Sequence, residues 1–386
     1  MRNRRLPLLG GLIAFLLLGF GAAVNAFGEL KVEWGRPLDL GRGLYARIHH
    51  VYGNRLMAAY SMDDGIAVRF ASPDTMASWT EPRIVARHLS VEKDGQRFQI
   101  WLANAEFAQL DTGRIILACN LRPQDRRHDI HPYSIAISTS DDAGETWSPL
   151  RIVYKAEISS PPDENEHGCY EPFVLPLKDG NAQIYFADET PYDRDGYQNI
   201  SVVETHDGGE SWSAVRIAAY KPGGRDGMPS ALDLGAWRFL AIETSGPGMH
   251  LHPEIVRTRK TSNWCETVGD PSPDRFGPLA EPPDWKAIYG GAPYLVATKN
   301  CILLSWQQCK GGLSLNDGLR AHVAVMPKTY AMDGRLTAMR MVSSPPVAEN
   351  SPSMLWNSLC HVAGDMFLLV TESGGRIIVY PGRITW

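Results

Sequence analysis

The amino-acid sequence predicts an all-β chain that folds into a single six-bladed β-propeller. Three observations support this fold class: a turn motif that repeats along the chain, short apolar segments typical of strands, and a length that divides into six similar units. Glycine and proline are plentiful, with 36 and 27 residues, as expected for many short strands joined by tight turns. We therefore expect helix to be nearly absent.

The repeated motif reads Ser/Thr-x-Asp-x-Gly-x-Thr/Ser-Trp and occurs at residues 140–147 and 205–212. A weaker copy at residues 72–79 keeps the spacing from Ser to Trp but lacks the Gly. In such a turn the Asp carboxylate accepts hydrogen bonds from backbone N–H groups, and the Gly adopts a positive φ. The copies begin 68 and 65 positions apart and each precedes a short apolar strand, so they indicate a structural repeat.

The N-terminus has the features of a secretory signal peptide. Three arginines precede an apolar run, Leu6–Val24, and the small residue Ala26 follows it. Removal of residues 1–26 would leave residues 27–386 as one domain with a formal net charge of −8, because three arginines leave with the signal segment. We expect a secreted or periplasmic protein that is attached to a membrane only if this segment is retained as an anchor.

The remaining 360 residues give about 60 to each of six units, close to the spacing of the motif. A strand at residues 30–34 precedes the first unit and is a candidate to close the last one. Each unit then reads as a four-stranded antiparallel sheet, and a ring of such sheets leaves no exposed edge. A β-helix or a large sandwich is the alternative, but the units are too long for β-helix coils. The first three strands of the units are expected near 44–48, 55–60 and 66–70; 104–108, 114–118 and 133–137; 170–174, 182–186 and 200–203; 227–231, 237–243 and 254–257; 291–296, 301–306 and 321–325; and 358–362, 366–371 and 376–380.

The composition limits the cofactors and partners that the chain is expected to bind. Six cysteines in an exported chain permit disulfides, and Cys301 with Cys309 is the expected local pair. His49-His50 and His250-x-His252 lack a third ligand at a suitable spacing, so we expect no metal and no cofactor. A mildly acidic chain without a basic patch argues against nucleic acid as a partner, and we expect a monomer.

Candidate functional residues come from the geometry of a propeller. The first strand of every blade lines the central axis, and the residues at its start converge on one mouth. The repeat alignment therefore selects one position per blade: Arg47, Asn104, Glu171, Asp226, Tyr289, and Trp356 with Asn357.

Two carboxylates in adjacent blades carry the chemical hypothesis. Glu171 begins an otherwise apolar strand, and Glu243 ends the second strand of the next blade. A charge at the edge of an apolar strand costs free energy unless it is paired or functional. Near one axis the two groups could lie ~5 Å apart, the separation used in retaining glycoside hydrolysis. The alternative is a structural role in which an arginine such as Arg225 or Arg47 pairs with the carboxylate.

The motifs centred on Asp74, Asp142 and Asp207 resemble the Asp boxes (BNR repeats) of the sialidase superfamily of propellers. The starts of the blades are similar to one branch of it, the exo-α-1,5-arabinanases of glycoside hydrolase family 93. This resemblance implies that the boxes are structural. The similar segments are Tyr45-Ala-Arg47-Ile, Asn104-Ala-Glu106, Tyr170-Glu171-Pro-Phe-Val-Leu, Gln183-Ile-Tyr-Phe-Ala-Asp188-Glu189, Asp226-Gly-Met-Pro229, Ile242-Glu243, Gly291-Ala-Pro-Tyr294 and Leu355-Trp-Asn-Ser-Leu359.

The resemblance also implies an activity. Glu171 matches the acid/base and Glu243 the nucleophile of an exported retaining exo-glycoside hydrolase that acts on α-1,5-linked arabinan or a related polysaccharide. Candidate substrate contacts are Arg47, Asn104, Asp226, Tyr289, Trp306 and Trp356.

Two other functions remain as alternatives. An exo-sialidase would need three arginines that converge on a carboxylate substrate, and only Arg47 fits such a position. A propeller that binds or assembles without catalysis is the second alternative, since fold does not fix function.

Overall fold

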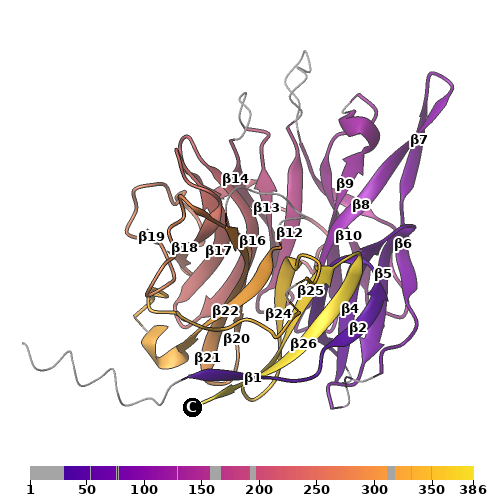
Figure 1. Ribbon diagram of the computed structural model, residues 1–386. Coiled ribbons are helices and arrows are strands. Elements are labelled where there is room, and N and C mark those ends of the chain that lie inside the picture. The colour runs from indigo at the N-terminus through magenta and orange to yellow at the C-terminus, as the bar shows by residue number, and fades with distance from the viewer. Residues whose placement is uncertain are drawn as a thin grey trace, which may run out of the picture.

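The computed structural model describes residues 30–386, except residues 53, 75, 77, 128, 157–166, 192–196, 311–317, 332 and 349. The strands form six antiparallel sheets (Figure 1). The first strand of each sheet contacts the first strand of the next, and the sixth contacts the first, so the sheets close into a ring. The predicted all-β, six-bladed propeller is confirmed.

Each blade is an antiparallel meander whose first strand lies at the axis. Blade 1 comprises β3 (Leu44–Val51), β4 (Arg55–Met62), β5 (Gly65–Ala71) and β6 (Arg83–Arg87); blade 2 comprises β8 (Gln96–Gln109), β9 (Ile115–Pro123), β10 (Ser134–Ser140) and β11 (Arg151–Lys155). Blade 3 comprises β12 (Cys169–Pro176), β13 (Ala182–Asp188), β14 (Asn199–Thr205) and β15 (Arg216–Ala219); blade 4 comprises β16 (Arg225–Leu234), β17 (Trp237–Ser245), β18 (His252–Arg259) and β19 (Arg275–Phe276). Blade 5 comprises β20 (Ile288–Ala297), β21 (Cys301–Lys310), β22 (Arg320–Pro327) and β23 (Arg340–Ser343); blade 6 comprises β24 (Leu355–Ala363), β25 (Met366–Ser373) and β26 (Arg376–Thr385).

The N-terminal strands complete blade 6. As expected, β1 (Lys31–Trp34) pairs with β26, and the unexpected β2 (Leu38–Arg42) pairs with the other part of the same strand. Trp34 of β1 packs edge-on against Phe367 of β25, with ring centroids 5.6 Å apart. Both ends of the described chain therefore meet in one sheet, which closes the ring.

Blade 2 carries an additional strand that the repeat did not predict. β7 (Leu89–Lys93) pairs with the first half of β8, and this hairpin extends beyond the other blades at the top of Figure 1. In the part of the chain that the structure describes, helix is confined to two short 3-10 turns, at residues 124–126 and 328–331. Among the described residues, no helix is long and apolar enough to cross a membrane. The predicted signal segment, residues 1–26, lies outside the described residues.

The expected disulfide between Cys301 and Cys309 is wrong. Both residues lie on β21, and all six cysteines are free thiols. An extended strand advances ~3.3 Å per residue, so eight steps separate the two thiols by far more than a disulfide spans. The apolar pattern that suggested a strand followed by a turn between them belongs to one continuous strand.

The Asp boxes at residues 140–147 and 205–212 are closed turns between the third and fourth strands of their blades. Oδ1 of Asp142 accepts a 2.8 Å hydrogen bond from the backbone N–H of Thr146, and the indole N–H of Trp147 donates to the carbonyl of Gly144. Asp207 and Trp212 repeat these bonds in the next blade. Because strands alternate in direction, these turns lie on the face opposite the starts of the first strands.

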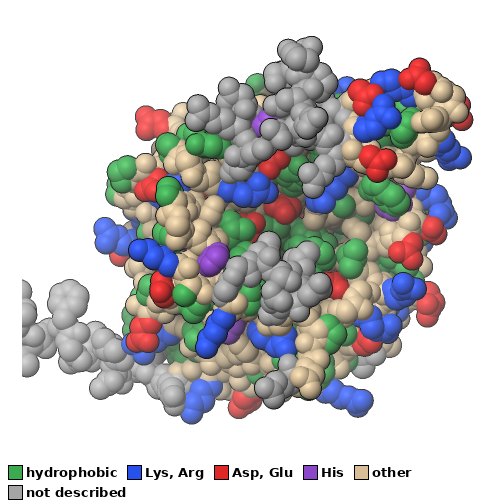
Figure 2. All heavy atoms as spheres, turned by 45° about the horizontal axis from the view of Figure 1, so that its top comes forward, with side chains coloured by type: hydrophobic (Ala, Val, Ile, Leu, Met, Phe, Trp, Pro, Cys, Tyr) green, Lys and Arg blue, Asp and Glu red, His purple; other side chains and the backbone are tan. Residues whose placement is uncertain are grey.

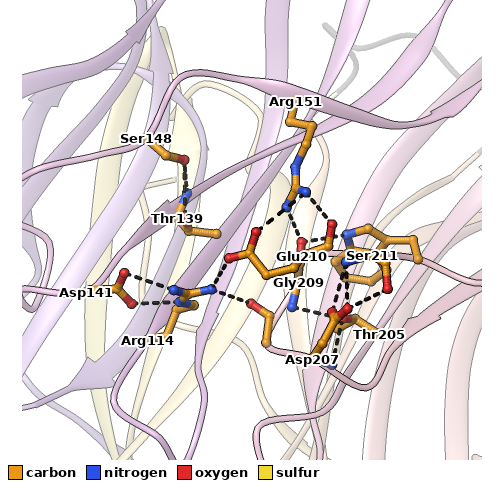
Figure 3. Close-up of polar contacts among 12 residues, drawn as sticks. Arg114, Thr139, Asp141, Ser148, Arg151, Thr205, Asp207, Gly209, Glu210 and Ser211 are labelled. Carbon is orange, nitrogen blue, oxygen red and sulfur yellow. Dashed lines mark hydrogen bonds and ion pairs between the residues drawn. The ribbon is translucent and has the colours of Figure 1, made fainter.

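Arginines of one blade hold the Asp box of the following blade (Figure 3). Arg114 of blade 2 forms a 2.6 Å ion pair with Glu210 and also bonds the carbonyl of Gly208. Arg151 donates to the carbonyls of Gly209 and Glu210. Arg55 and Arg83 of blade 1 contact the box of blade 2 at Glu145 in the same way. The boxes thus join neighbouring blades.

Candidate active site

The first strand of every blade contains one non-glycine residue at positive φ. At the same point, the register with the second strand shifts, as in a β-bulge. A non-glycine residue in this conformation costs about 1 kcal/mol, and such strain is retained where it serves the architecture or a site. The six residues, with φ between 47° and 58°, are Tyr45, Asn104, Glu171, Met228, Ala292 and Trp356.

These bulges set the floor of the mouth. Tyr45, Met228 and Ala292 form a buried apolar cluster, and Trp356 packs against it. Figure 2, which brings this face forward, shows acidic and basic side chains together in the hollow at its middle.

The bulges also correct the alignment that selected the candidate residues. Asn104, Glu171 and Trp356 are bulge residues. Arg47 lies two positions after its bulge residue, Asp226 two positions before, and Tyr289 three positions before. The six candidates therefore occupy different levels along the axis rather than one.

Glu171 and Glu243 come together at the mouth. Oε2 of Glu171 accepts a 3.0 Å hydrogen bond from the backbone N–H of Met228. Glu243 pairs across the sheet with Gly227, and a Cβ added to Gly227 would lie 3.2 Å from Oε1 of Glu243. Both carboxylates therefore lie against the segment Gly227–Met228.

The electrostatics of the two carboxyl groups are coupled. Burial raises the pKa of Glu243 to about 7, and the neighbouring charge of Glu171 adds to the rise. Burial also raises the pKa of Glu171, while the charges of Arg225, Arg122 and Arg47 lower it. Two such groups lose their protons in linked steps, so the site can hold one proton and one negative charge near neutral pH.

Two arginines of the mouth were not predicted as site residues. Arg225 begins β16, is about one-third exposed and forms a 2.7 Å ion pair with Glu189. Arg122 of β9 donates to Oδ1 of Asn104 and lies over the ring of Tyr170, 5.3 Å from its centroid. The repeat alignment selected Asp226, the residue after Arg225, whereas Arg122 lies on a second strand and its long side chain reaches Asn104.

Tyr289 and Gln307 line the other flank of Glu243. A Cβ on Gly291 would lie 2.2 Å from the hydroxyl of Tyr289 and 2.8 Å from Oε2 of Glu243, so both groups crowd the same glycine. Burial and the charge of Glu243 raise the pKa of Tyr289, which keeps its phenol protonated and able to donate. Gln307 pairs across the sheet with Gly291, in the same way that Glu243 pairs with Gly227. Oε1 of Gln307 accepts a 2.7 Å hydrogen bond from the backbone N–H of Trp356.

Five of the six predicted substrate contacts are buried in the protein. Arg47 is 2% exposed, bonds the carbonyl of Trp356 at 3.0 Å and lies 3.4 Å from Glu106. Asp226 is fully buried and binds Arg275 through both carboxylate oxygens, at 2.7 and 2.9 Å. Trp306 is fully buried and stacks on His322. Asn104 and Tyr289, at 8% and 5% exposed, are also buried, and Trp356 is partly exposed at the mouth.

The described residues contain no group of three or more His, Cys, Asp or Glu side chains that could hold a metal ion. The mouth itself carries the carboxyl pair Glu171 and Glu243, the phenol of Tyr289, and the arginines Arg122 and Arg225.

One feature of the sequence could have located the bulges and so aligned the first strands of the six blades. The residue after each bulge is Ala, Pro or Asn: Ala46, Ala105, Pro172, Pro229, Pro293 and Asn357. Proline, which cannot donate to a strand ladder, is tolerated at bulges, so its recurrence at this place marks the bulge.

Residues 53–232 match the BNR repeat-like domain family. No curated protein matches the chain. Among solved structures, a protein of unknown function from Dyadobacter fermentans aligns with a TM-score of 0.65 at 13% identity, covering 92% of this chain and 99% of that one. The GH93 α-L-arabinofuranosidase of Fusarium graminearum, in complex with arabinobiose, aligns with a TM-score of 0.62 at 14% identity, covering 91% and 98%. The NanB sialidase of Streptococcus pneumoniae aligns with a TM-score of 0.58 at 10% identity, covering 89% and 69%.

These likenesses agree with the expected resemblance at the level of fold. The chain contains BNR repeats and has the six-bladed, sialidase-like propeller fold that glycoside hydrolases share. At identities below one-fifth, these alignments show the fold alone.

Proposed function

We propose that this chain is an exported, retaining exo-glycoside hydrolase that acts on α-1,5-linked arabinan or a related polysaccharide. The observation that carries the proposal is the pair Glu171 and Glu243, which face one backbone segment in a half-buried mouth and titrate together. The Fusarium graminearum neighbour was solved with arabinobiose, which supports an arabinan fragment as the substrate class. Export rests on the signal-peptide pattern of residues 1–26.

The proposed reaction uses both carboxyl groups. Glu171 donates its proton to the oxygen of the departing sugar while the carboxylate of Glu243 attacks the anomeric carbon. The resulting glycosyl ester is hydrolysed by a water from which Glu171 removes a proton, so the configuration is retained. Tyr289, protonated beside Glu243, is suited to donate a hydrogen bond to the sugar ring or to the nucleophile.

The roles of the two residues are assigned by the family resemblance. The surrounding charges favour the opposite distribution of the proton in the free protein, since three arginines lower the pKa of Glu171 and one lowers that of Glu243. The identity of the pair and the role of each member are therefore separate claims, which need separate experiments.

An exo-sialidase is a weaker candidate despite three arginines near the mouth. Arg47 bonds the carbonyl of Trp356 and lies beside Glu106, Arg122 bonds Asn104, and Arg225 forms an ion pair with Glu189. All three also act on the protein's own carboxylate, Glu171. They are thus committed to protein groups rather than converging on a site for a substrate carboxylate.

The test is sugar release from debranched linear arabinan by the mature chain, with Glu171→Gln and Glu243→Gln alongside. Activity that both substitutions reduce by 10³-fold or more would support the carboxyl pair, and the size of the products would distinguish exo from endo cleavage. Full activity in both variants would refute the site. A wild type that is inactive on arabinan and on sialosides would favour a binding scaffold instead.

A further inference from the structure

The hairpin that rises above blade 2 exposes an aromatic side chain beside the mouth. Trp101 on β8 is 44% exposed, although Ile100 and Leu102 on either side of it are buried. A singly exposed apolar residue needs no explanation by itself. The position of Trp101 and its neighbours distinguish it from the other exposed hydrophobic residues.

Trp101 faces the blade that carries Glu171. Ile100 and Leu102 pack into the apolar cluster that blade 2 shares with blade 1, so the alternate residue, Trp101, points toward blade 3. Its direct cross-strand partner is Arg122, which reaches to Asn104 and lies over the ring of Tyr170, the neighbour of Glu171. Trp101 therefore stands beside an arginine that contacts the neighbour of the proposed acid.

The indole is also held in place. The ring of His88 contacts it edge-on, with centroids 5.0 Å apart, and Nδ1 of His88 accepts a 3.0 Å hydrogen bond from the backbone N–H of Leu102. A rigid aromatic surface on a strand loses little entropy when it binds a ligand. Trp101 lies three residues before the bulge residue Asn104, so the indole stands roughly 10 Å from the bulge along the hairpin.

We propose that Trp101, with Arg122 beside it, is a distal sugar-binding platform for the part of the polysaccharide that continues beyond the cleaved bond. This rests on the proposed function. The flat indole face offers an apolar surface to the C–H face of a sugar ring, and Arg122, held by Asn104 and Tyr170, fixes the strand position beside it. The platform thus lengthens the site from one bond to a short stretch of polymer.

The test compares substrates of different length. For the wild type, Trp101→Ala and Tyr52→Ala, kcat/KM is measured on the shortest linear arabino-oligosaccharide that is cleaved and on debranched arabinan. Tyr52 is a matched control, since it is 74% exposed and lies in the turn after β3, on the opposite face. We expect the ratio of kcat/KM for long over short substrate to fall about tenfold in Trp101→Ala and to keep its wild-type value in Tyr52→Ala. An unchanged ratio in Trp101→Ala would overturn the platform, whether both values stay the same or fall together.

A binding measurement separates this inference from the proposed activity. If the wild type cleaves no arabinan, the proposed function fails. The affinity of the wild type and of both variants for soluble arabinan is then measured by titration calorimetry. Weaker binding by Trp101→Ala than by Tyr52→Ala would keep the platform as a polysaccharide site. Equal binding by both, or no binding by the wild type, would overturn it.

Discussion

The backbone N–H of Ala292 donates a 2.8 Å hydrogen bond to Oε2 of Glu243, which ties the second strand of blade 4 to the bulge of blade 5. The same contact joins Glu171 to Met228 and Gln307 to Trp356. In each case the side-chain oxygen of one blade accepts the bulge amide of the next blade. The conformation that strains the backbone thus also supplies the donors that orient the two proposed catalytic carboxylates.

The raised pKa of Glu243 predicts a stability that depends on pH. Its folded-state pKa of about 7 exceeds the ordinary value of 4.5, so the stabilisation is present at low pH and is lost as the pH rises through 7. The difference corresponds to about 3 kcal/mol between pH 4.5 and pH 8. Glu243→Gln should therefore unfold at higher urea concentration than the wild type at pH 8 and lose this advantage at pH 5. The exposed Glu266→Gln in the same blade is the control, and an equal pH dependence in wild type and Glu243→Gln would contradict the prediction.

The roles of the two carboxylates are separable by azide rescue. On an aryl arabinoside with a good leaving group, Glu171→Ala should retain formation of the glycosyl intermediate, and added azide should yield a glycosyl azide of retained configuration. Glu243→Ala should be inactive without azide and give the inverted product with it, because azide then replaces the nucleophile. The configuration is determined by NMR. If Glu171→Ala instead gives the inverted azide and Glu243→Ala the retained one, Glu243 is the acid and Glu171 the nucleophile. The arginines around Glu171 favour that assignment, because they lower its pKa.

A methyl group at Gly291 should disturb the site without changing a polar residue. Its carbon would lie 2.2 Å from the hydroxyl of Tyr289 and 2.8 Å from Oε2 of Glu243, so one or both must move. Displacement of a reacting group by about 1 Å can lower the rate on the order of 10²-fold, and we expect a loss of that size in kcat/KM for Gly291→Ala. Gly277→Ala, where the new carbon meets nothing within 4 Å, should keep its activity. Equal activity in both variants would show that Tyr289 and Glu243 tolerate the shift.

The buried pair Asp226–Arg275 predicts a loss of stability. Both residues are at most 8% exposed, and Arg275 also pairs with Glu254 at 2.5 Å. Arg275→Met leaves the buried carboxylate of Asp226 without its partner and should lower the free energy of unfolding by about 3 kcal/mol. The exposed pair of Arg376 with Asp39 is the control, and Arg376→Met should have little effect. If Arg275→Met unfolds at the same urea concentration as the wild type, the ion pair is not structural, and Asp226 is again a candidate for substrate binding.

The Asp boxes should differ in their contribution to the melting temperature. Asp142 accepts bonds from Ser140 and from both the backbone and the hydroxyl of Thr146, within a turn that arginines of blade 1 hold. Asp142→Ala should lower the Tm by several degrees and leave kcat/KM unchanged, because the turn lies on the face opposite the mouth. Asp74→Ala, in the box without Gly, should lower the Tm less. A loss of kcat/KM at an unchanged Tm would contradict a structural role for the box.

Much of the fold was predictable because it follows from local chemistry. The Asp boxes repeat with a fixed spacing, and the apolar strands between them imply sheets that cannot bury their faces alone. The number of blades, the order of the strands and the closure by residues 30–34 all follow from that pattern. Glu171 and Glu243 could be selected as candidates from the sequence, since a charged residue at the edge of an apolar strand is conspicuous against its neighbours.

The tertiary structure decided which side chains meet. A bulge adds one residue to a strand and changes the face to which the next side chains point, so the level of each residue along the axis depended on bulges that the spacing alone did not locate. For this reason Arg47 and Asp226 turned into buried ion pairs, while Arg122, from a second strand, reached the mouth through the length of its side chain. Local sequence determined the blades of this protein, whereas contacts between residues far apart in the chain determined its mouth.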